Sequence, residues 1–376
     1  MIYKPFAEIT LEDIIKLKED GVEEGKQIDY KQQLNFMNRD KKKEFAKDVT
    51  SFANTEGGDL IIGVSEEKGA INEILGIEVL DKDALRLSIE SFLRTSIEPQ
   101  LSNIGINFYP IGERFILHIH VPKSYNGPHI ANKAKFVARN SAGNYELDYT
   151  EIKQRFTASK GIESEMESYH FERLMKIKRD DGYWETGDGA AIVMHIMPIQ
   201  SFADSFFVTD LSREKFELEP LFYSVHEPKI NFNGVAGVGE KAYHHINRQG
   251  ITEIVDKGYL NRHFMNNTDA EPIVGTLIIS KAEEALENAL RNAELLGFNG
   301  PYYVFTALID VKDRIFGMDR YGPYGEAHRD NDMIFPKIIV SNPQDISEYK
   351  NTLEILFDNA SGRFRFPSVN NMKKLK

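Results

Sequence analysis

A short segment near the start of the chain places an acidic and a basic residue two positions apart, and side chains of these types can act on phosphates. In the run QIDYKQ, apolar and polar residues alternate, so that Asp29 and Lys31 share one phase. This period of two predicts a half-buried strand with both side chains on one face. Glu24 precedes Asp29 by five residues across a short bend and can approach the same face. Carboxylates beside a lysine are suited to holding a divalent cation and to stabilising phosphate charge.

A lysine-rich helix is expected directly after this strand, at residues 40–55. Phe45, Val49 and Phe52 follow the spacing of an apolar helix face, and lysines cover much of the other side. A lysine run is either a solvated helix face or a surface that contacts phosphates, and the sequence allows both. A strand expected at residues 135–140 adds basic residues near both ends. The candidate nucleic-acid contacts are Lys41, Lys42, Lys43, Lys47, Lys135 and Arg139.

The helix is expected to end in a polar, glycine-containing turn that opens onto an apolar strand at residues 60–64. Two consecutive glycines let the chain turn sharply and let a backbone approach a ligand closely, although most such pairs are only turns. Asn54, Thr55, Gly57 and Gly58 therefore form a candidate ligand loop. A further acidic residue, Glu66, follows the strand.

Composition limits the classes of protein that the chain can be. It has 376 residues, enough for two domains, and a formal net charge of −12. Residues 1–160 hold 22 basic and 25 acidic residues, and the remainder holds 24 and 33, so the acidic excess is mainly C-terminal. There is no cysteine, which excludes disulfides and thiolate ligands and favours a cytoplasmic location. No signal peptide and no membrane span are expected.

The chain is predicted to contain two domains, at residues 1–158 and 168–376. The polar segment between them, residues 159–167, contains a glycine and is the predicted linker. In the second domain, a strand at residues 274–279, a helix at 282–296 and a strand at 302–311 predict a βαβ unit. The fold class is therefore α/β or α+β for the chain, with an α+β second domain.

Two runs resemble the Alba-like nucleic-acid-binding domain of the Schlafen family. That family shows a Glu-x-x-x-x-Glu-Phe-Lys element, to which EGKQIDYK is similar, and a later Phe-Ala-Asn-Thr-x-Gly-Gly-x-Leu-x-Ile-Gly-Val-x-Asp element. FANTEGGDLIIGV matches the second element almost throughout, and FVARN and YTEIKQRF fit the end of the domain. The resemblance covers roughly residues 8–158 and implies a Schlafen-like mixed α/β domain there. Residues 165–376 resemble no family that we recognise.

The resemblance also implies a set of functional residues. Ribonucleases of the family use three carboxylates to hold a divalent metal ion and cleave transfer or ribosomal RNA, and these fall on Glu24, Asp29 and Glu66. Asp29 stands where the family has glutamate, and Glu66 stands where it has aspartate. The length of each side chain therefore differs from that of the family by one methylene, while its charge is the same. Three oxygen ligands suit Mg²⁺ or Mn²⁺, and Lys31 is placed to stabilise charge on the phosphate.

Three functions follow from these observations, and the sequence does not choose between RNA and DNA. The leading hypothesis is a metal-dependent endoribonuclease that acts on tRNA or structured RNA as an anti-phage defence effector. In this hypothesis the C-terminal domain senses a signal or drives assembly, for example into a homo-oligomer. The second is a non-catalytic DNA- or RNA-binding regulator. The third is an ATP-binding module that uses the turn at residues 54–58.

Overall fold

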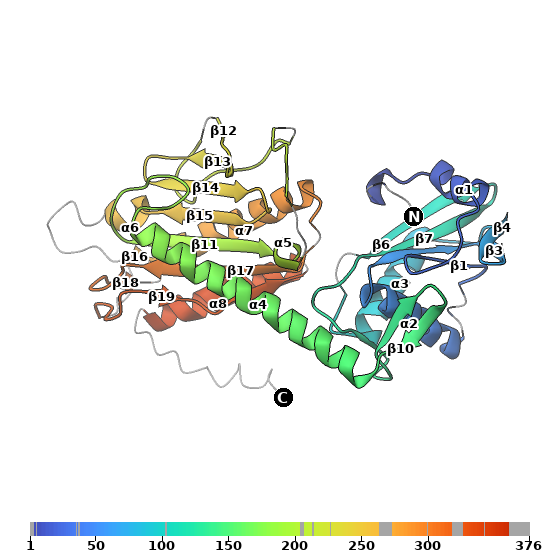
Figure 1. The fold of residues 1–376 in the computed structure, drawn as a ribbon. Helices are drawn as coiled ribbons and strands as arrows, with labels where there is room; N and C mark the ends of the chain where they lie inside the picture. The colour runs from blue at the N-terminus through green and yellow to red at the C-terminus, as the bar shows by residue number, and fades with distance from the viewer. Residues whose placement is uncertain are drawn as a thin grey trace. The chain divides into compact units, whose positions relative to one another are not determined.

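The computed structural model divides into two compact units, residues 1–163 and 164–376. It describes residues 4–360 with the exception of residues 5, 35, 37, 102–103, 204–206, 213, 226, 263–272, 299, 318–325 and 342. Both units combine helices with sheets, so the predicted mixed α/β and α+β class is confirmed (Figure 1). Within the described residues, no helix is both long and apolar enough to cross a membrane.

The N-terminal unit is built on a four-stranded sheet with the order β1-β2-β7-β6. The short edge strand β1 runs parallel to β2, and the other neighbours are antiparallel. The bounds of the four strands are β1 Ile28–Lys31, β2 Gly58–Ile62, β6 Gly105–Ile111 and β7 Arg114–Val121. Strand β1 confirms the alternation that the sequence predicted for Asp29 and Lys31.

Helices cover both faces of this sheet. The apolar sides of α2 and α3 pack over Leu60, Ile62 and Leu117, whereas α1 packs over the opposite face at Ile61 and Ile116. The helices are α1 Leu11–Glu19, α2 Arg39–Ala53 and α3 Lys82–Ser96, with the 3-10 turn η1 Phe6–Glu8. Three small strand pairs complete the unit: β3 Val64–Glu67 with β4 Ala70–Ile74, β5 Ile97–Glu98 with β8 Ile130–Ala131, and β9 Val137–Asn140 with β10 Gly143–Glu146.

The C-terminal unit contains a larger antiparallel sheet with the order β12-β13-β14-β15-β11-β17-β19, and β20 also pairs with β17. Its central strands β11 and β17 are buried along their whole length, which explains their almost continuous apolar sequence. The bounds are β11 Ala191–Pro198, β12 Lys229–Ile230, β13 Gly234–Val238, β14 Ala242–Asn247, β15 Thr252–Asp256, β17 Tyr302–Ile309, β19 Met333–Ile334 and β20 Ile338–Val340.

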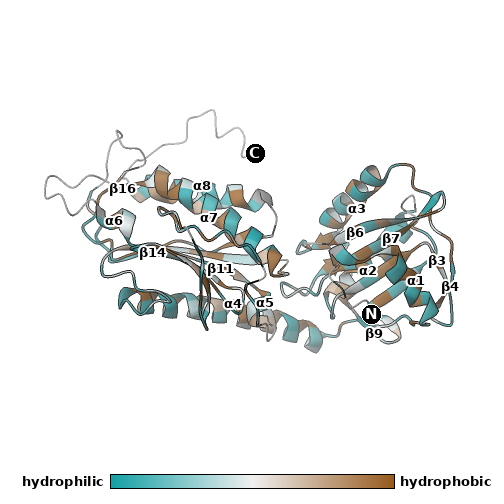
Figure 2. Ribbon diagram, turned by 90° about the horizontal axis from the view of Figure 1, so that it is seen from above, coloured by the Kyte–Doolittle hydropathy of each residue, from teal (hydrophilic) through white to brown (hydrophobic). Residues whose placement is uncertain are grey.

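Helices α7 and α8 cover one face of this sheet, and the last turns of α4 cover the other (Figure 1). Alternate residues of β11 divide between the faces: Ile192 and Met194 pack with α7, whereas Val193 packs with α4. Bands of apolar and polar residues are visible along α7 and α8 in Figure 2. The remaining elements are α4 Tyr149–Lys178, α5 Gln200–Ala203, α6 Gly258–Arg262, α7 Gly275–Leu295, α8 Pro343–Ala360, β16 Ile273–Val274 and β18 Phe316–Gly317.

The polar segment at residues 159–167, the predicted linker, is helical. It lies inside α4, a continuous helix of 30 residues, and the division between the units falls within it, after Glu163. Gly161 was the signal for a turn, but it lies on the exposed side of the helix with no atom near the position of a Cβ. The glutamates and alanine around it are good helix formers, and one glycine weakens a helix without ending it.

The predicted strand at residues 274–279 is wrong, because α7 begins at Gly275. A short apolar run with β-branched residues fits a strand or a buried helix equally well by its periodicity. Here Ile278, Ala282 and Ala285 continue one buried helix face. The expected βαβ unit is therefore absent from this segment, and β17 pairs only with antiparallel neighbours.

Candidate nucleic-acid site

The free edge of β1 is capped by a side chain rather than by another strand. Glu24, which precedes the strand, accepts a hydrogen bond from the backbone N–H of Tyr30 at 2.6 Å through Oε1. The buried Arg139, from β9, donates to the carbonyl of Gly25 at 2.7 Å. These contacts satisfy backbone groups that an edge strand leaves unpaired, and they hold Glu24 against β1.

Asp29 lies between two cations on the face of β1 that packs toward α2. Its Oδ2 is 2.8 Å from the ammonium of Lys31, and its Oδ1 is 3.1 Å from a guanidinium nitrogen of Arg139. Asp29 is only 2% exposed. Although burial alone would raise the pKa of Asp29, a hydrogen bond with Glu24 and the charges of Lys31 and Arg139 lower it. Asp29 is therefore ionised at neutral pH.

The three predicted acids meet at Glu24. Burial and hydrogen bonds with Asp29 and Glu66 raise the pKa of Glu24 to about 8, against a smaller lowering by the N–H of Tyr30. At neutral pH Glu24 therefore keeps a proton, which it donates to a neighbouring carboxylate. Glu66 reaches this group from β3, where its side chain is exposed. In the described part of the chain, no group of three or more His, Asp or Glu side chains is spaced to hold a metal ion.

A fourth acid, Asp48 of α2, belongs to the same group of contacts, and the sequence analysis missed it. Its Oδ1 accepts a hydrogen bond from Asn144 at 2.6 Å, and Asn144 in turn lies 3.4 Å from Arg139. Burial and the charge of Asp29 raise the pKa of Asp48 to about 6, although Lys31 and Asn144 act in the opposite direction. The available signal was an aspartate within the apolar phase of a helix, between Phe45 and Phe52.

A cleft of about 300 Å³ opens beside Asp29, between β1 and α2. Its lining combines Lys31 and Asp48 with apolar side chains that include Leu34 and Phe36. Since Lys31 also pairs with Asp29, it belongs both to the lining of the cleft and to the surroundings of the acidic group. The N-terminal unit therefore carries a hollow next to its concentration of carboxylates.

The predicted phosphate-contacting residues fall into two groups. The side chains of Lys41, Lys43, Lys47 and Lys135 are exposed, although three of them pair with nearby acids: Lys41 with Glu44 at 2.8 Å, Lys43 with Asp40 at 3.5 Å and Lys135 with Glu146 at 2.5 Å. Lys42 is half-buried and lies over the rings of Phe36 and Phe92. Arg139 is 5% exposed and holds Asp29, so it is placed as a buried partner rather than as a surface contact.

The turn at residues 54–58 is held by packing. The amide of buried Asn54 donates to the carbonyls of His129 and Val137 at 2.8 and 2.9 Å, and its Oδ1 accepts from the N–H of His129 at 2.7 Å. Thr55 donates to Ser51 and accepts from the N–H of Arg139. These bonds occupy the side chains that the sequence analysis proposed for ligand contact.

The glycines of this turn are also explained by close approach. A Cβ at Gly57 would lie 2.6 Å from the backbone nitrogen of Lys123, and Gly57 has a φ of +74°. A Cβ at Gly58 would meet the ring of Phe52. Both positions therefore require glycine for reasons internal to the unit.

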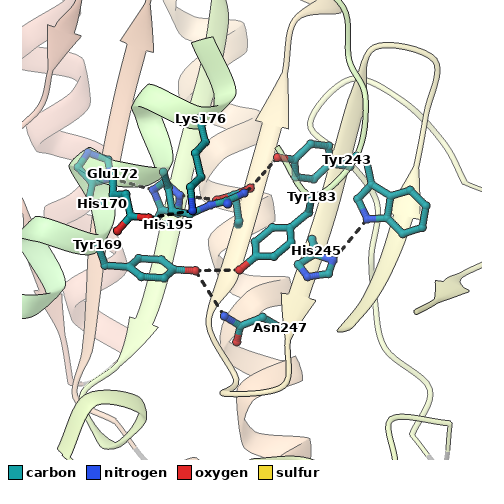
Figure 3. A network of polar contacts seen from close by, with 12 residues as sticks. Tyr169, His170, Glu172, Lys176, Tyr183, His195, Tyr243, His245 and Asn247 are labelled. Atoms are coloured by element: carbon teal, nitrogen blue, oxygen red, sulfur yellow. Dashed lines mark hydrogen bonds and ion pairs between the residues drawn. The ribbon is translucent and has the colours of Figure 1, made fainter. Parts of the chain in front are cut away.

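The C-terminal unit contains a separate network of polar side chains, in which Figure 3 labels His170, His195 and Tyr243. Its centre is Glu253 of β15, which is fully buried. Two nitrogens of Arg173 contact its carboxylate at 2.6 and 2.7 Å, and His195 and Tyr243 contact it at 2.9 and 2.6 Å. His195 is joined at 2.7 Å to His170 of α4. The hydrogen bonds and the charge of Arg173 lower the pKa of Glu253 to about 2, despite the opposing effect of burial. The network thus attaches α4 to the sheet by an ionised pair.

Comparison with known proteins identifies a domain in the N-terminal unit. Residues 24–148 match the family model described as Schlafen, AlbA_2. No curated protein matches the chain.

Two solved structures are similar to less than half of the chain. One is the DIP2311 protein from Corynebacterium diphtheriae, with 17% identity and a TM-score of 0.28 over 39% of this chain and 31% of that one. The other is the N-terminal domain of a putative ATP-dependent DNA helicase RecG-related protein from Nitrosomonas europaea, with 19% identity and a TM-score of 0.29 over 38% of this chain and 96% of that one. The chain thus spans less than a third of the length of the first structure.

Proposed function

Since residues 24–148 constitute a Schlafen AlbA_2 domain, we propose that this chain binds nucleic acid and cleaves RNA with a divalent metal ion held by Glu24, Asp29 and Glu66. Nucleic-acid binding follows from the domain. The cleavage, the metal ion and the choice of RNA are the further content of the proposal.

The proposal is carried by the shared proton of the acidic group. Partial burial and hydrogen bonds with Asp29 and Glu66 raise the pKa of Glu24 to about 8, so its carboxyl group is protonated at neutral pH. Carboxylates that are this close repel one another, and either a proton or a cation relieves the repulsion. A hard divalent cation such as Mg²⁺ or Mn²⁺ prefers oxygen ligands and would replace that proton. The oxygen donors therefore suit such an ion by their type, and the three side chains would have to leave their hydrogen-bonded arrangement to take up its ligand spacing.

The remaining side chains divide the work around such an ion. A bound ion would polarise the phosphate and lower the pKa of an attached water molecule. Asp29 is kept ionised by Arg139 behind it and Lys31 beside it, so it offers a charged oxygen without first losing a proton. The side chain of Lys31 is 38% exposed, which lets its ammonium reach a phosphate as well as Asp29.

Replacement of Asp29 by asparagine tests the cleavage. Asp29→Asn keeps the shape but removes the ionised ligand, so cleavage of total tRNA in Mn²⁺ should be lost, while RNA binding in EDTA is retained or strengthened. Mn²⁺ affinity, measured by calorimetry without RNA, should fall in parallel. Asp20→Asn, which changes an exposed aspartate at the end of α1, is the matched control and should behave as the wild type.

A non-catalytic nucleic-acid-binding regulator is the second candidate. One observation favours it: the three acids are joined through hydrogen bonds, and within the described residues no acid or histidine group is spaced for a metal ion. A wild-type protein that binds RNA but leaves it uncut in Mn²⁺, and shows no Mn²⁺ binding, would replace the nuclease proposal with this one.

A further inference from the structure

The cleft between β1 and α2 differs from a phosphate site in its charge. Lys31 and Lys41 are the cations among its lining residues, and each is already paired with a carboxylate, with Asp29 and Glu44 respectively, at 2.8 Å. Asp48 adds a buried acid to the same wall. The two lysines and the two acids that line the cleft, Glu44 and Asp48, therefore leave it without net positive charge. The occupant of this cleft is expected to be uncharged.

The lining residues suit a small, partly polar group. Leu34 and Phe36 supply apolar surface, and the floor is completed by apolar residues of β2. Gln32 and Gln33, which follow Lys31 and are exposed, bring amide donors and acceptors to the mouth. A hydrophobic pocket with a few polar groups of this kind, at about 300 Å³, has the size and composition of a small-ligand site.

We infer that this cleft receives one unpaired base of a bound nucleic-acid strand, and that it favours a base that carries an exocyclic amine. Single-stranded bases are recognised by stacking on aromatic side chains and by hydrogen bonds to their edges, and a base inside a duplex offers neither. Asp48 supplies a carboxylate that accepts a hydrogen bond from an amine such as N4 of cytosine. Uracil offers a carbonyl at that position.

The position of the cleft connects it with the acidic group. Lys31 contributes to the cleft wall and contacts Asp29, so a base seated in the cleft would hold its own sugar-phosphate beside Glu24 and Asp29. The inference rests on the nucleic-acid-binding part of the proposed function and not on cleavage. It adds that the bound strand is single-stranded or locally opened at this point.

Binding in EDTA to four fluorescent probes tests the inference: a short oligocytidine, an oligouridine, an abasic ribose-phosphate of the same length, and the oligocytidine annealed to its complement. The wild type should bind oligocytidine about 10-fold more tightly than the abasic probe, the typical effect of one stacked base. It should also prefer oligocytidine to oligouridine and to the duplex. Fluorescence anisotropy gives each affinity.

Two variants assign the effect to the cleft. Gln33→Ala changes an exposed side chain that the fold does not need, and it should reduce the advantage of oligocytidine over the abasic probe. Asp48→Asn keeps the shape of the buried side chain and should remove the preference for cytosine over uracil. Neither should alter binding of the abasic probe. Gln100→Ala, at an exposed glutamine that does not line the cleft, is the control.

Equal affinity of the wild type for oligocytidine and the abasic probe would overturn the inference, as would a preference that survives in both cleft variants. A wild type that cuts tRNA in Mn²⁺ but shows no base dependence would overturn the inference and leave the nuclease proposal standing. Base-dependent binding by a wild type that does not cut tRNA in Mn²⁺ would support the inference and overturn the nuclease proposal.

Discussion

Asp59 of β2 is buried in the N-terminal unit. Its Oδ1 lies 2.8 Å from Nε2 of His118 and 2.8 Å from Nδ1 of His120. A carboxylate only accepts hydrogen bonds, so both histidine nitrogens must donate. Although burial would raise the pKa of Asp59, the hydrogen bonds from the two histidines lower it to about 2. His118 is fully buried and donates a hydrogen bond to Asp59.

The stability of the N-terminal unit should therefore depend on the ionisation of Asp59. A carboxylate whose folded pKa is depressed stabilises the fold above its ordinary pKa of 3.8 and loses this effect as the pH falls through about 2. Asp59→Asn should lower the free energy of unfolding by about 2 kcal/mol near pH 6. The difference from the wild type should shrink steadily between pH 4 and pH 2.

Urea unfolding followed by far-UV circular dichroism measures this difference. The single tryptophan, Trp184, lies in the C-terminal unit, so its fluorescence transition should be the same in both proteins. A wild-type advantage that stays constant down to pH 2 would show that the contribution of Asp59 does not come from its charge.

Residue types and spacing were sufficient to predict that Asp29 and Lys31 share a face, because strand geometry is local. They were not sufficient for the partners that set the charge of Asp29. Arg139 lies 110 positions further along the chain and reaches Asp29 only when the β9–β10 hairpin packs on α2. For this reason Arg139 is predicted from the sequence alone to be a phosphate contact on the surface. Asp48 was missed because its burial depends on the same hairpin, through Asn144.

At the scale of elements, α4 combines an apolar and a charged attachment to the sheet of the C-terminal unit. Leu174 and Ile177 enter its core, while Arg173 and His170 join the network around Glu253. The continuity of α4 was not predicted, because residues 159–167 have the composition of a linker. The buried pair could not be predicted either, because Arg173 and Glu253 lie 80 positions apart. Long-range pairing of this kind leaves no local pattern.

Removal of the charge on Glu253 should loosen this attachment. Glu253→Gln leaves the guanidinium of Arg173 buried without a counter-charge, which typically costs about 3 kcal/mol or more. Glu172→Gln is the matched control, because Glu172 pairs with Lys176 on the exposed side of the same helix and its loss should have no measurable effect. Urea unfolding followed by Trp184 fluorescence compares the two. Equal effects would contradict an energetic role for the buried pair.

At the scale of the whole chain, two units of different composition are joined by one helix. The N-terminal unit holds the candidate nucleic-acid site, and most of the net negative charge lies beyond it. A sequence with a clear family pattern in one part allowed the site to be predicted there, whereas the C-terminal unit offered only periodicity. In that unit the antiparallel sheet order is set by pairings between distant strands, such as β11 with β17. The run at residues 274–279 was therefore assigned to a strand by its composition alone.

The stretch of α4 at residues 157–165 is mostly exposed, so its resistance to proteases should depend on the helix itself. Gly161 lies within this stretch, and a Cβ there would meet nothing within 4 Å. Gly161→Ala should therefore stabilise the helix locally by about 0.5–1 kcal/mol and slow proteolytic cleavage between the units roughly threefold. Ala158→Gly, in the same exposed stretch, should accelerate it. Mass spectrometry of the fragments locates the cut, which we expect at residues 159–167. Cleavage rates that are the same in both variants would show that this segment opens without losing helix, as an irregular linker does.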